Sequence, residues 1–299
     1  MILPLLGLAA GALSAPTNQT SSSTLKIEEA VFDGKPAFRL SNNTARLVVS
    51  PHLGRVVEYG LTEGPNVLYS VKSEVGRDGY RNVGGDMVWY GPESFWKGVP
   101  DPAWDGTPMK VEKLKDGIRL TSERGKYQPL RLVREIRLDA NGPRVTFVNR
   151  MTNEGGEPIT ASLRQVTQLA SPAEVRLPRR STASQPRGYA VLQGRLNPQA
   201  ARVESDQLRI VLHPSQSFKY GSRGGMGTVA ADVARLRFQS TSPIARGGRY
   251  PEQDSAKIVY TAPASVGFAR IEHLAPLEAL EPRQVQQQVV TWNLAPLSN

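Results

Sequence analysis

Apolar residues recur at every second position along much of this chain, and this period restricts what the chain can fold into. The stretches 130–138 (LRLVREIRL), 144–151 (RVTFVNRM) and 159–169 (ITASLRQVTQL) all alternate apolar and polar residues. A half-buried β-strand has a side-chain period of two, whereas an amphipathic helix repeats near 3.6. No stretch of the N-terminal half has a convincing helical period, and turn pairs such as Asp33-Gly34 separate the candidate strands. We therefore predict an all-β fold of antiparallel strands in large sheets packed face to face.

The strand pattern continues to the end of the chain without a break in composition. Candidate strands lie at residues 208–213, 257–261, 267–273 and 285–294. Residues 172–201 are instead rich in Pro, Arg and Ser with weak periodicity, so we predict an excursion over the surface there. A chain of 299 residues is long enough to form one large β domain, which we place at residues 25–297.

The N-terminus has the composition of a targeting segment. Residues 2–13 (ILPLLGLAAGAL) form a short apolar run, and SAP at 14–16 offers small residues for cleavage, although a positively charged start is missing. We predict a signal peptide at residues 1–15, a flexible leader at 16–24, and export to the periplasm or the exterior. No second apolar stretch is long enough for a membrane span.

Composition excludes several kinds of chemistry. The chain has no cysteine, which rules out disulfides and thiol catalysis, and its three histidines (His52, His213 and His273) lack helical ligand spacing. We therefore expect no metal site and no cofactor. The net charge of +10 comes from arginines scattered along the strands, with one small cluster at 176–180, which favours a solvated basic surface and no nucleic-acid partner. The oligomeric state is left open.

The segment 83–104 (VGGDMVWYGPESFWKGVPDPAW) concentrates aromatic and acidic side chains. It contains three of the chain's four tryptophans. A flat ring can cover the C–H face of a pyranose while a carboxylate accepts hydrogen bonds from its hydroxyls, so this mixture is typical of sugar sites. The alternative is that the rings close the end of a β core. The residues that we expect to contact a sugar here are Asp86, Trp89, Tyr90, Glu93 and Trp96.

Several stretches resemble the galactose-mutarotase-like β-supersandwich superfamily, which includes aldose 1-epimerases and hexose-6-phosphate epimerases. Residues 39–69 are similar to the family's opening, Gly84-Gly85-Asp86 with Trp89-Tyr90-Gly91-Pro92 is similar to the turn and aromatic-Pro segment of the phosphate-sugar branch, and residues 249–294 are similar to its ending. An exported branch of unknown function resembles the chain more closely, through Lys219-Tyr220-Gly221 and Tyr250-Pro251. The resemblance spans residues 38–294 and implies a single antiparallel supersandwich, with Lys219 and Tyr250 among the ligand-binding residues.

The resemblance also implies a catalytic pair, of which this sequence matches one member. Mutarotases open the sugar ring with a base and with an acid that is usually His. Glu272 matches the base, but the strand that would carry the acid, 159–169, offers Arg164 and no His. His213 is the substitute that we would test first. His273 follows Glu272 directly and should face the other side of the sheet.

Three functions stay open from the sequence. The first is a carbohydrate-binding protein without efficient mutarotase chemistry, in which Trp89, Trp96 and Tyr90 stack on a sugar or oligosaccharide, Asp86 and Glu272 accept hydrogen bonds, and Arg164 or Lys219 donate them. The second is an active aldose or sugar-phosphate 1-epimerase with Glu272 as base. The third is a non-catalytic structural or interaction module of the cell envelope.

Overall fold

The computed structural model describes residues 25–71, 82–225 and 227–297. The predicted signal peptide and leader lie outside the described residues. Within these ranges no helix is long and apolar enough to cross a membrane. The two helical elements found there are short turns, namely η2 (Glu93–Phe95) and α1 (Pro251–Asp254).

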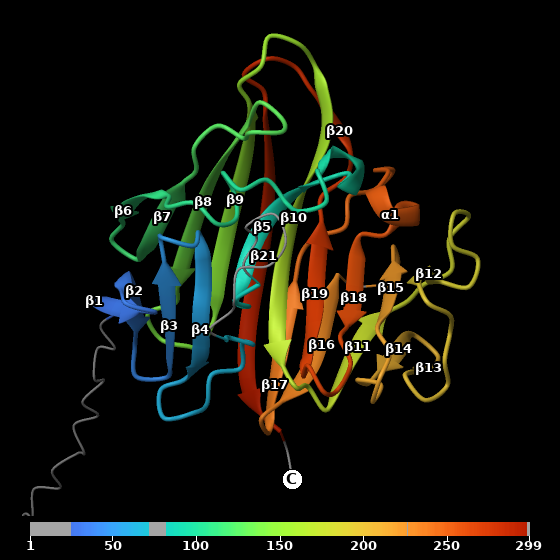
Figure 1. The fold of residues 1–299 in the computed structure, drawn as a ribbon. Helices are drawn as coiled ribbons and strands as arrows, with labels where there is room; N and C mark the ends of the chain where they lie inside the picture. The colour runs from blue at the N-terminus through green and yellow to red at the C-terminus, as the bar shows by residue number, and fades with distance from the viewer. Residues whose placement is uncertain (1–24, 72–81, 226, 298–299) are drawn as a thin grey trace, which may run out of the picture.

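Strands of the described residues form two antiparallel sheets of 11 and 10 strands, which confirms the predicted all-β fold (Figure 1). Along the larger sheet the order is β1 (Lys26–Phe32), β2 (Lys35–Ser41), β3 (Ala45–Ser50), β4 (Arg55–Leu61), β5 (Asp86–Gly91), β10 (Ile159–Ala170), β19 (Phe268–Leu274), β18 (Lys257–Thr261), β15 (Phe218–Ser222) and β12 (Ala190–Gln193), with β20 (Glu278–Leu280) paired to β10. The second sheet has the order β13 (Ala201–Val203), β14 (Gln207–Ile210), β11 (Glu174–Pro178), β16 (Thr228–Val233), β17 (Leu236–Thr241), β21 (Val285–Pro296), β9 (Val145–Asn153), β8 (Leu130–Leu138), β7 (Gly117–Thr121) and β6 (Lys110–Lys113).

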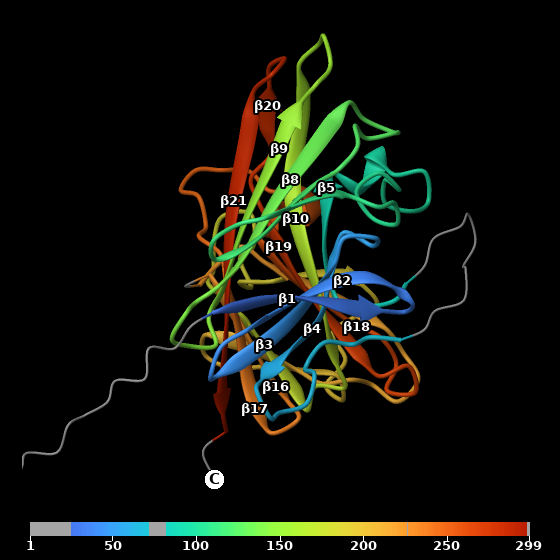
Figure 2. The same ribbon diagram turned by 90° about the vertical axis from the view of Figure 1, so that its left-hand side faces the viewer.

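The main hydrophobic core lies between the two sheets. Seen from the side, β8, β9 and β21 run along one direction while β1 to β4 of the larger sheet run across it (Figure 2). Inward-facing side chains of both layers, such as Leu163, Phe147 and Trp292, are fully or almost fully buried in one cluster. The alternating pattern of β8 and β9 is therefore explained, because every second residue faces inward and is buried, and most of these residues belong to this cluster.

One part of the sequence prediction was wrong in its secondary structure. Residues 172–201 include two strands, β11 and β12, which join different sheets. In β11 the apolar residues Val175 and Leu177 alternate with Arg176 and are fully buried. The strand was missed because it is short and flanked by Pro and Arg residues that lower the apparent periodicity.

The long central strand β10 positions the candidate site. It pairs with β5 on one side and β19 on the other, so that Arg164 lies opposite Trp89, and Val166 opposite both Met87 and Glu272. The side chains of these five residues lie on one face of the larger sheet and point away from the second sheet. We call this face the outer face of the larger sheet.

Candidate functional site

Two glycines that precede β5 pack closely against the backbone of neighbouring segments. Gly84 and Gly85 have φ values of +83° and +81°. A Cβ added to them would lie 1.9 Å from the Tyr69 carbonyl oxygen and 2.3 Å from the Val56 carbonyl oxygen, respectively. Only glycine satisfies both the backbone conformation and the close approach. The Gly-Gly pair therefore fixes where β5 begins.

Alternation along β5 sends its side chains to two different environments. Met87 and Trp89 lie on the outer face, where they pack with Val166 and Trp96. Tyr90 faces the core between the sheets. The acidic and aromatic residues of this segment therefore do not form one site.

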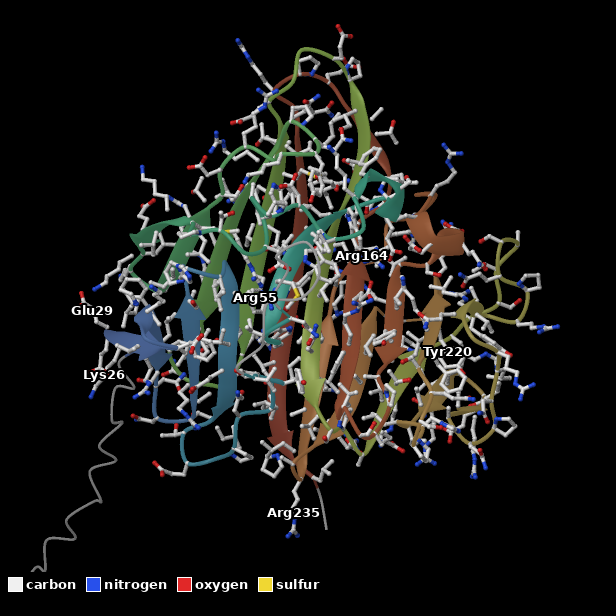
Figure 3. The ribbon with its side chains drawn as sticks, in the orientation of Figure 1. Lys26, Glu29, Arg55, Arg164, Tyr220 and Arg235 are labelled. Carbon is white, nitrogen blue, oxygen red and sulfur yellow. The ribbon has the colours of Figure 1, made fainter. Side chains whose placement is uncertain are left out.

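A group of six charged side chains occupies the outer face beside Trp89, and we call it the charged cluster. Its members are three cations and three carboxylates, namely Arg164, Lys219, Arg270, Glu93, Glu252 and Glu272. Four of them come from strands β10, β15 and β19 of the sheet, while Glu93 and Glu252 come from the turns η2 and α1. Figure 3 shows Arg164 at the upper part of the sheet, below these turns.

Glu272 lies at the bottom of the charged cluster with both carboxylate oxygens engaged. Arg164 Nε donates to Oε2 over 2.5 Å, and Arg270 Nε donates to Oε1 over 2.7 Å. Burial alone would raise the pKa of Glu272, but the charges of Arg164 and Arg270 outweigh it and lower the pKa to about 2. Glu272 is therefore ionised at neutral pH and is a weak base.

Two carboxylates from the turns complete the charge balance above Glu272. Glu93 Oε1 lies 2.8 Å from Arg164 Nη1 and 2.7 Å from Lys219 Nζ. Burial acts to raise the pKa of Glu93, yet Arg164 and Lys219 bring it below its ordinary value. Glu252 is farther from both cations, at 3.6 Å from Arg164 and 3.9 Å from Lys219. Its pKa is raised, first by burial and also by the neighbouring Glu93 and Glu272 charges.

Aromatic rings border the charged cluster. Trp89 and Trp96 meet edge to face with centroids 5.2 Å apart, and the Arg164 guanidinium lies 5.4 Å from the Trp96 ring. Arg270 lies 5.4 Å from the Trp89 ring and 4.9 Å from the Tyr260 ring. These cation–π contacts hold the two arginines in place. Trp89 is buried, whereas Trp96 and Tyr260 are partly exposed.

The structure brings together six of the residues predicted to bind or act on a sugar. They are Trp89, Glu93, Trp96, Arg164 and Lys219, and Glu272 joins them from β19. Tyr250 immediately precedes the turn α1, but it packs with Ile258 and Leu274 and makes no recorded contact with the charged cluster in the described part of the chain.

Asp86 and Tyr90 do not reach this group. The Asp86 carboxylate is fully buried between the sheets, where it pairs with Arg134 and accepts hydrogen bonds from Gln165 and Thr167. The Tyr90 hydroxyl donates to Asp101 over 2.8 Å, and its ring packs on Trp104 in the core. For these two residues the placement corresponds to the alternative in which the segment closes a β core.

None of the three histidines lies at the charged cluster. His213 follows β14, and its Nδ1 accepts from the backbone N–H groups of Ser215 and Gln216. His273 faces the second sheet with its Nε2 2.7 Å from Ser240 Oγ, as the alternation along β19 requires. His52 lies in the turn after β3. The geometry therefore does not place an imidazole opposite Glu272.

Sequence reasoning missed two members of the charged cluster. Arg270 could have been found, because it lies two positions before Glu272 on one strand and must share its face. Glu252 had no such signal. It reaches the cluster because Glu252, Gln253 and Asp254 all have positive φ values of 54° to 60°. This left-handed turn is rare for residues other than glycine, and no sequence pattern marked it.

Comparisons with known proteins concern the fold. No family model matches the chain, and neither does any curated protein. A candidate aldose 1-epimerase from Escherichia coli K12 matches with a TM-score of 0.60 at 13% identity, over 91% of this chain and 100% of that one. Galactose mutarotase-like proteins from Clostridium acetobutylicum (TM-score 0.60, 11% identity, 92% and 99% covered) and Lactobacillus casei (TM-score 0.58, 8% identity, 87% and 100% covered) also match. The chain therefore has the galactose mutarotase-like fold, as its resemblance to that superfamily implied.

Proposed function

We propose that the chain binds a carbohydrate on the outer face of the larger sheet and does not catalyse efficient epimerisation. The state of Glu272 carries this proposal. The carboxylate that matches the family's base is fully buried, and its two oxygens are held by Arg164 and Arg270. Efficient general bases have a pKa near the working pH, whereas that of Glu272 is lowered to about 2. Glu272 would orient the two arginines instead of taking a proton.

The groups around Glu272, most of them partly exposed, suit a sugar. Trp96 and Tyr260 offer partly exposed ring faces for the C–H side of a pyranose. Glu93 can accept hydrogen bonds from hydroxyls, and Lys219 and Arg270 can donate to sugar oxygens. The galactose mutarotase-like fold supports the same ligand class by analogy only.

Calorimetry against a panel of mono- and oligosaccharides tests binding. We expect wild type to bind at least one sugar, and Trp96→Ala to weaken that affinity by about 1–2 kcal/mol through loss of stacking. Trp96→Phe, which keeps a ring, should recover part of the loss. A panel without any binding, or equal affinities for wild type and Trp96→Ala, would contradict the proposal.

A second candidate, an aldose or sugar-phosphate 1-epimerase, is favoured by the position of Glu272 on the late strand β19. Its acid would have to be a residue other than His at this site, and Lys219 lies within the same cluster. Polarimetry of freshly dissolved glucose and galactose, with sugar phosphates in parallel, separates the two candidates. We expect no acceleration by wild type over Glu272→Gln. A faster rate with wild type would establish the epimerase instead.

A further inference from the structure

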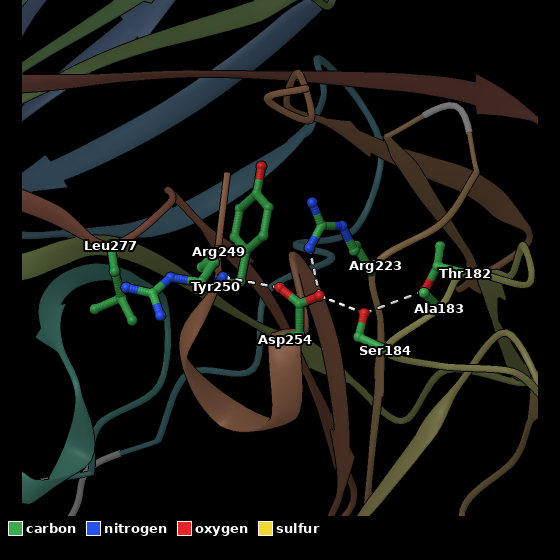
Figure 4. A pocket seen from close by; sticks show the side chains of 8 residues that line it. All are labelled: Thr182, Ala183, Ser184, Arg223, Arg249, Tyr250, Asp254 and Leu277. Atoms are coloured by element: carbon green, nitrogen blue, oxygen red, sulfur yellow. Dashed lines mark hydrogen bonds and ion pairs between the residues drawn. The ribbon is translucent and has the colours of Figure 1, made fainter. Parts of the chain in front are cut away.

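A cavity lies beside the turn α1, its lining includes no member of the charged cluster, and we call it the rim pocket. Its volume is about 810 Å³. Small-molecule sites usually measure about 300–1,000 Å³, so a sugar-sized group fits. The wall includes Thr182, Ser184, Arg223, Arg249, Tyr250 and Leu277 (Figure 4).

Asp254 holds the walls of the rim pocket together. It accepts a hydrogen bond from the Tyr250 backbone N–H over 3.0 Å and forms an ion pair with Arg223. The Ser184 hydroxyl donates to the same carboxylate and thereby ties the 182–184 loop to the turn. These contacts are drawn in Figure 4. The pocket is therefore formed before any ligand arrives.

The rim pocket has an apolar surface with one unmatched positive charge. The Tyr250 ring lies 5.6 Å from the Arg223 guanidinium, and the side chains of Leu277 and Ala183 add carbon surface. Arg223 is neutralised by Asp254. For Arg249, which is exposed and lies toward Leu277 in Figure 4, no ion pair occurs within the described residues. A ligand group with an apolar face and one negative charge complements this lining.

One turn separates the rim pocket from the charged cluster. Tyr250 and Asp254 line the pocket, while Glu252 between them faces Arg164 and Lys219. Pro251 of the same turn lies against Gly91, which leads to Glu93. A chain of linked sugars on the outer face could therefore extend over this turn into the rim pocket.

We propose that the rim pocket is a second subsite, which takes an acidic unit of an oligosaccharide whose neighbouring unit lies at the charged cluster. The inference rests on the proposed carbohydrate binding. The acidic group is a carboxylate or a sulfate ester, and the Arg249 guanidinium binds it. The ligand is thus an acidic oligosaccharide, longer than a single sugar.

Calorimetry with the full chain at low salt tests the subsite. The probes are oligogalacturonates of one to four units for the carboxylate, sulfated carrageenan oligosaccharides for the sulfate, and malto-oligosaccharides as neutral controls. We expect an acidic series to gain about tenfold or more in affinity between one and two or more units, because charge-assisted hydrogen bonds form in the rim pocket. The neutral series should gain less.

Two matched variants locate the gain. Arg249→Gln should remove the increase with length for the acidic series and leave the affinity for single sugars unchanged. Arg246→Gln removes an exposed arginine from the same loop that does not line the pocket, and it should behave like wild type.

The outcomes distinguish the two proposals. Affinities that do not rise with length, or a gain that persists in Arg249→Gln, would overturn the second subsite while carbohydrate binding stands. If Arg246→Gln lost the same gain in affinity, the effect would come from net charge alone, and the second subsite would again be overturned. Absence of binding by every probe and every panel sugar would overturn both.

Discussion

Two buried arginine–carboxylate pairs lie on opposite faces of the same central strands, and they differ in what surrounds them. On the inner face, Asp86 of β5 pairs with Arg134 of β8 and is also bound by Gln165 and Thr167. On the outer face, Glu272 of β19 pairs with Arg164 of β10. Both carboxylates are fully buried.

The inner pair is closed by protein on every side, whereas the outer pair is covered only by turns. Arg134 has one carboxylate partner, and burial lowers its pKa to about 9. Arg164 has three carboxylate neighbours, two of which, Glu93 and Glu252, are partly exposed on turns. The comparison teaches that the same pair of residue types connects two sheets on one face, whereas on the other face its arginine has additional carboxylate partners from turns.

The largest expected effect is on the inner pair. Asp86→Ala leaves the buried Arg134 without its carboxylate, so we expect the free energy of unfolding to fall by about 3–5 kcal/mol. Urea denaturation measures this loss. Asp116→Ala removes a partly exposed partner of Arg137 and should cost only about 0–1 kcal/mol. Equal losses of unfolding free energy in the two variants would show that the buried pair is no more important for stability than an exposed one.

Removal of the outer carboxylate should cost less stability. In Glu272→Ala, Glu93 and Glu252 remain near Arg164, so the expected loss is about 1–3 kcal/mol in the same denaturation experiment. Saccharide affinity should fall, because Arg164 and Arg270 lose the group that orients them. A loss as large as that of Asp86→Ala would show that the outer pair is equally structural.

Low pH should reduce the stability that the ion pairs of Glu272 contribute. The folded-state pKa of Glu272 is lowered from 4.5 to about 2, so its stabilisation is present above about pH 4.5 and is lost as the pH falls toward 2. Unfolding free energies measured from pH 7 to pH 3 should decline less in Glu272→Gln than in wild type. Parallel curves for the two proteins would argue against this coupling.

The smallest expected effect is at Glu252. Its pKa is raised, which means that folding disfavours its ionised form relative to the unfolded chain. Gln resembles the protonated form, so Glu252→Gln should leave the stability at pH 7 unchanged or slightly higher, within about 1 kcal/mol. Chemical denaturation at pH 7 checks this. A clear loss would indicate that the ion pairs of Glu252 are stronger than its 3.6 Å and 3.9 Å separations suggest.

Most strands could be predicted from the sequence, because apolar and polar residues alternate where one face of a strand is buried. Residues 130–138 were predicted as a strand and form β8 with the same bounds. β16 was missed, because its buried positions Val229, Ala231 and Val233 have a weaker apolar signal in a segment that follows a glycine-rich turn. Contacts between strands far apart in sequence could not be read from alternation at all.

The alternation of side chains along a strand also predicts which candidate site residues can share a face, and our sequence prediction did not apply this rule to β5. Asp86 and Trp89 are three positions apart, so a regular strand must send them to opposite faces, as β5 does. The same rule separated Glu272 from His273 correctly. The turn that carries Glu252 depends on three left-handed backbone conformations, which sequence periodicity does not encode.

Because Glu93 bridges Arg164 and Lys219, both of these cations already have a carboxylate partner before any ligand binds. An incoming ligand must compete with this internal carboxylate, so its affinity reflects the difference between two partners and not the full attraction of two bare cations. Bulk polyanions attracted by the net charge of +10 gain little from such an exchange. For the saccharide that we propose, discrimination at this face would therefore come from shape and stacking more than from charge.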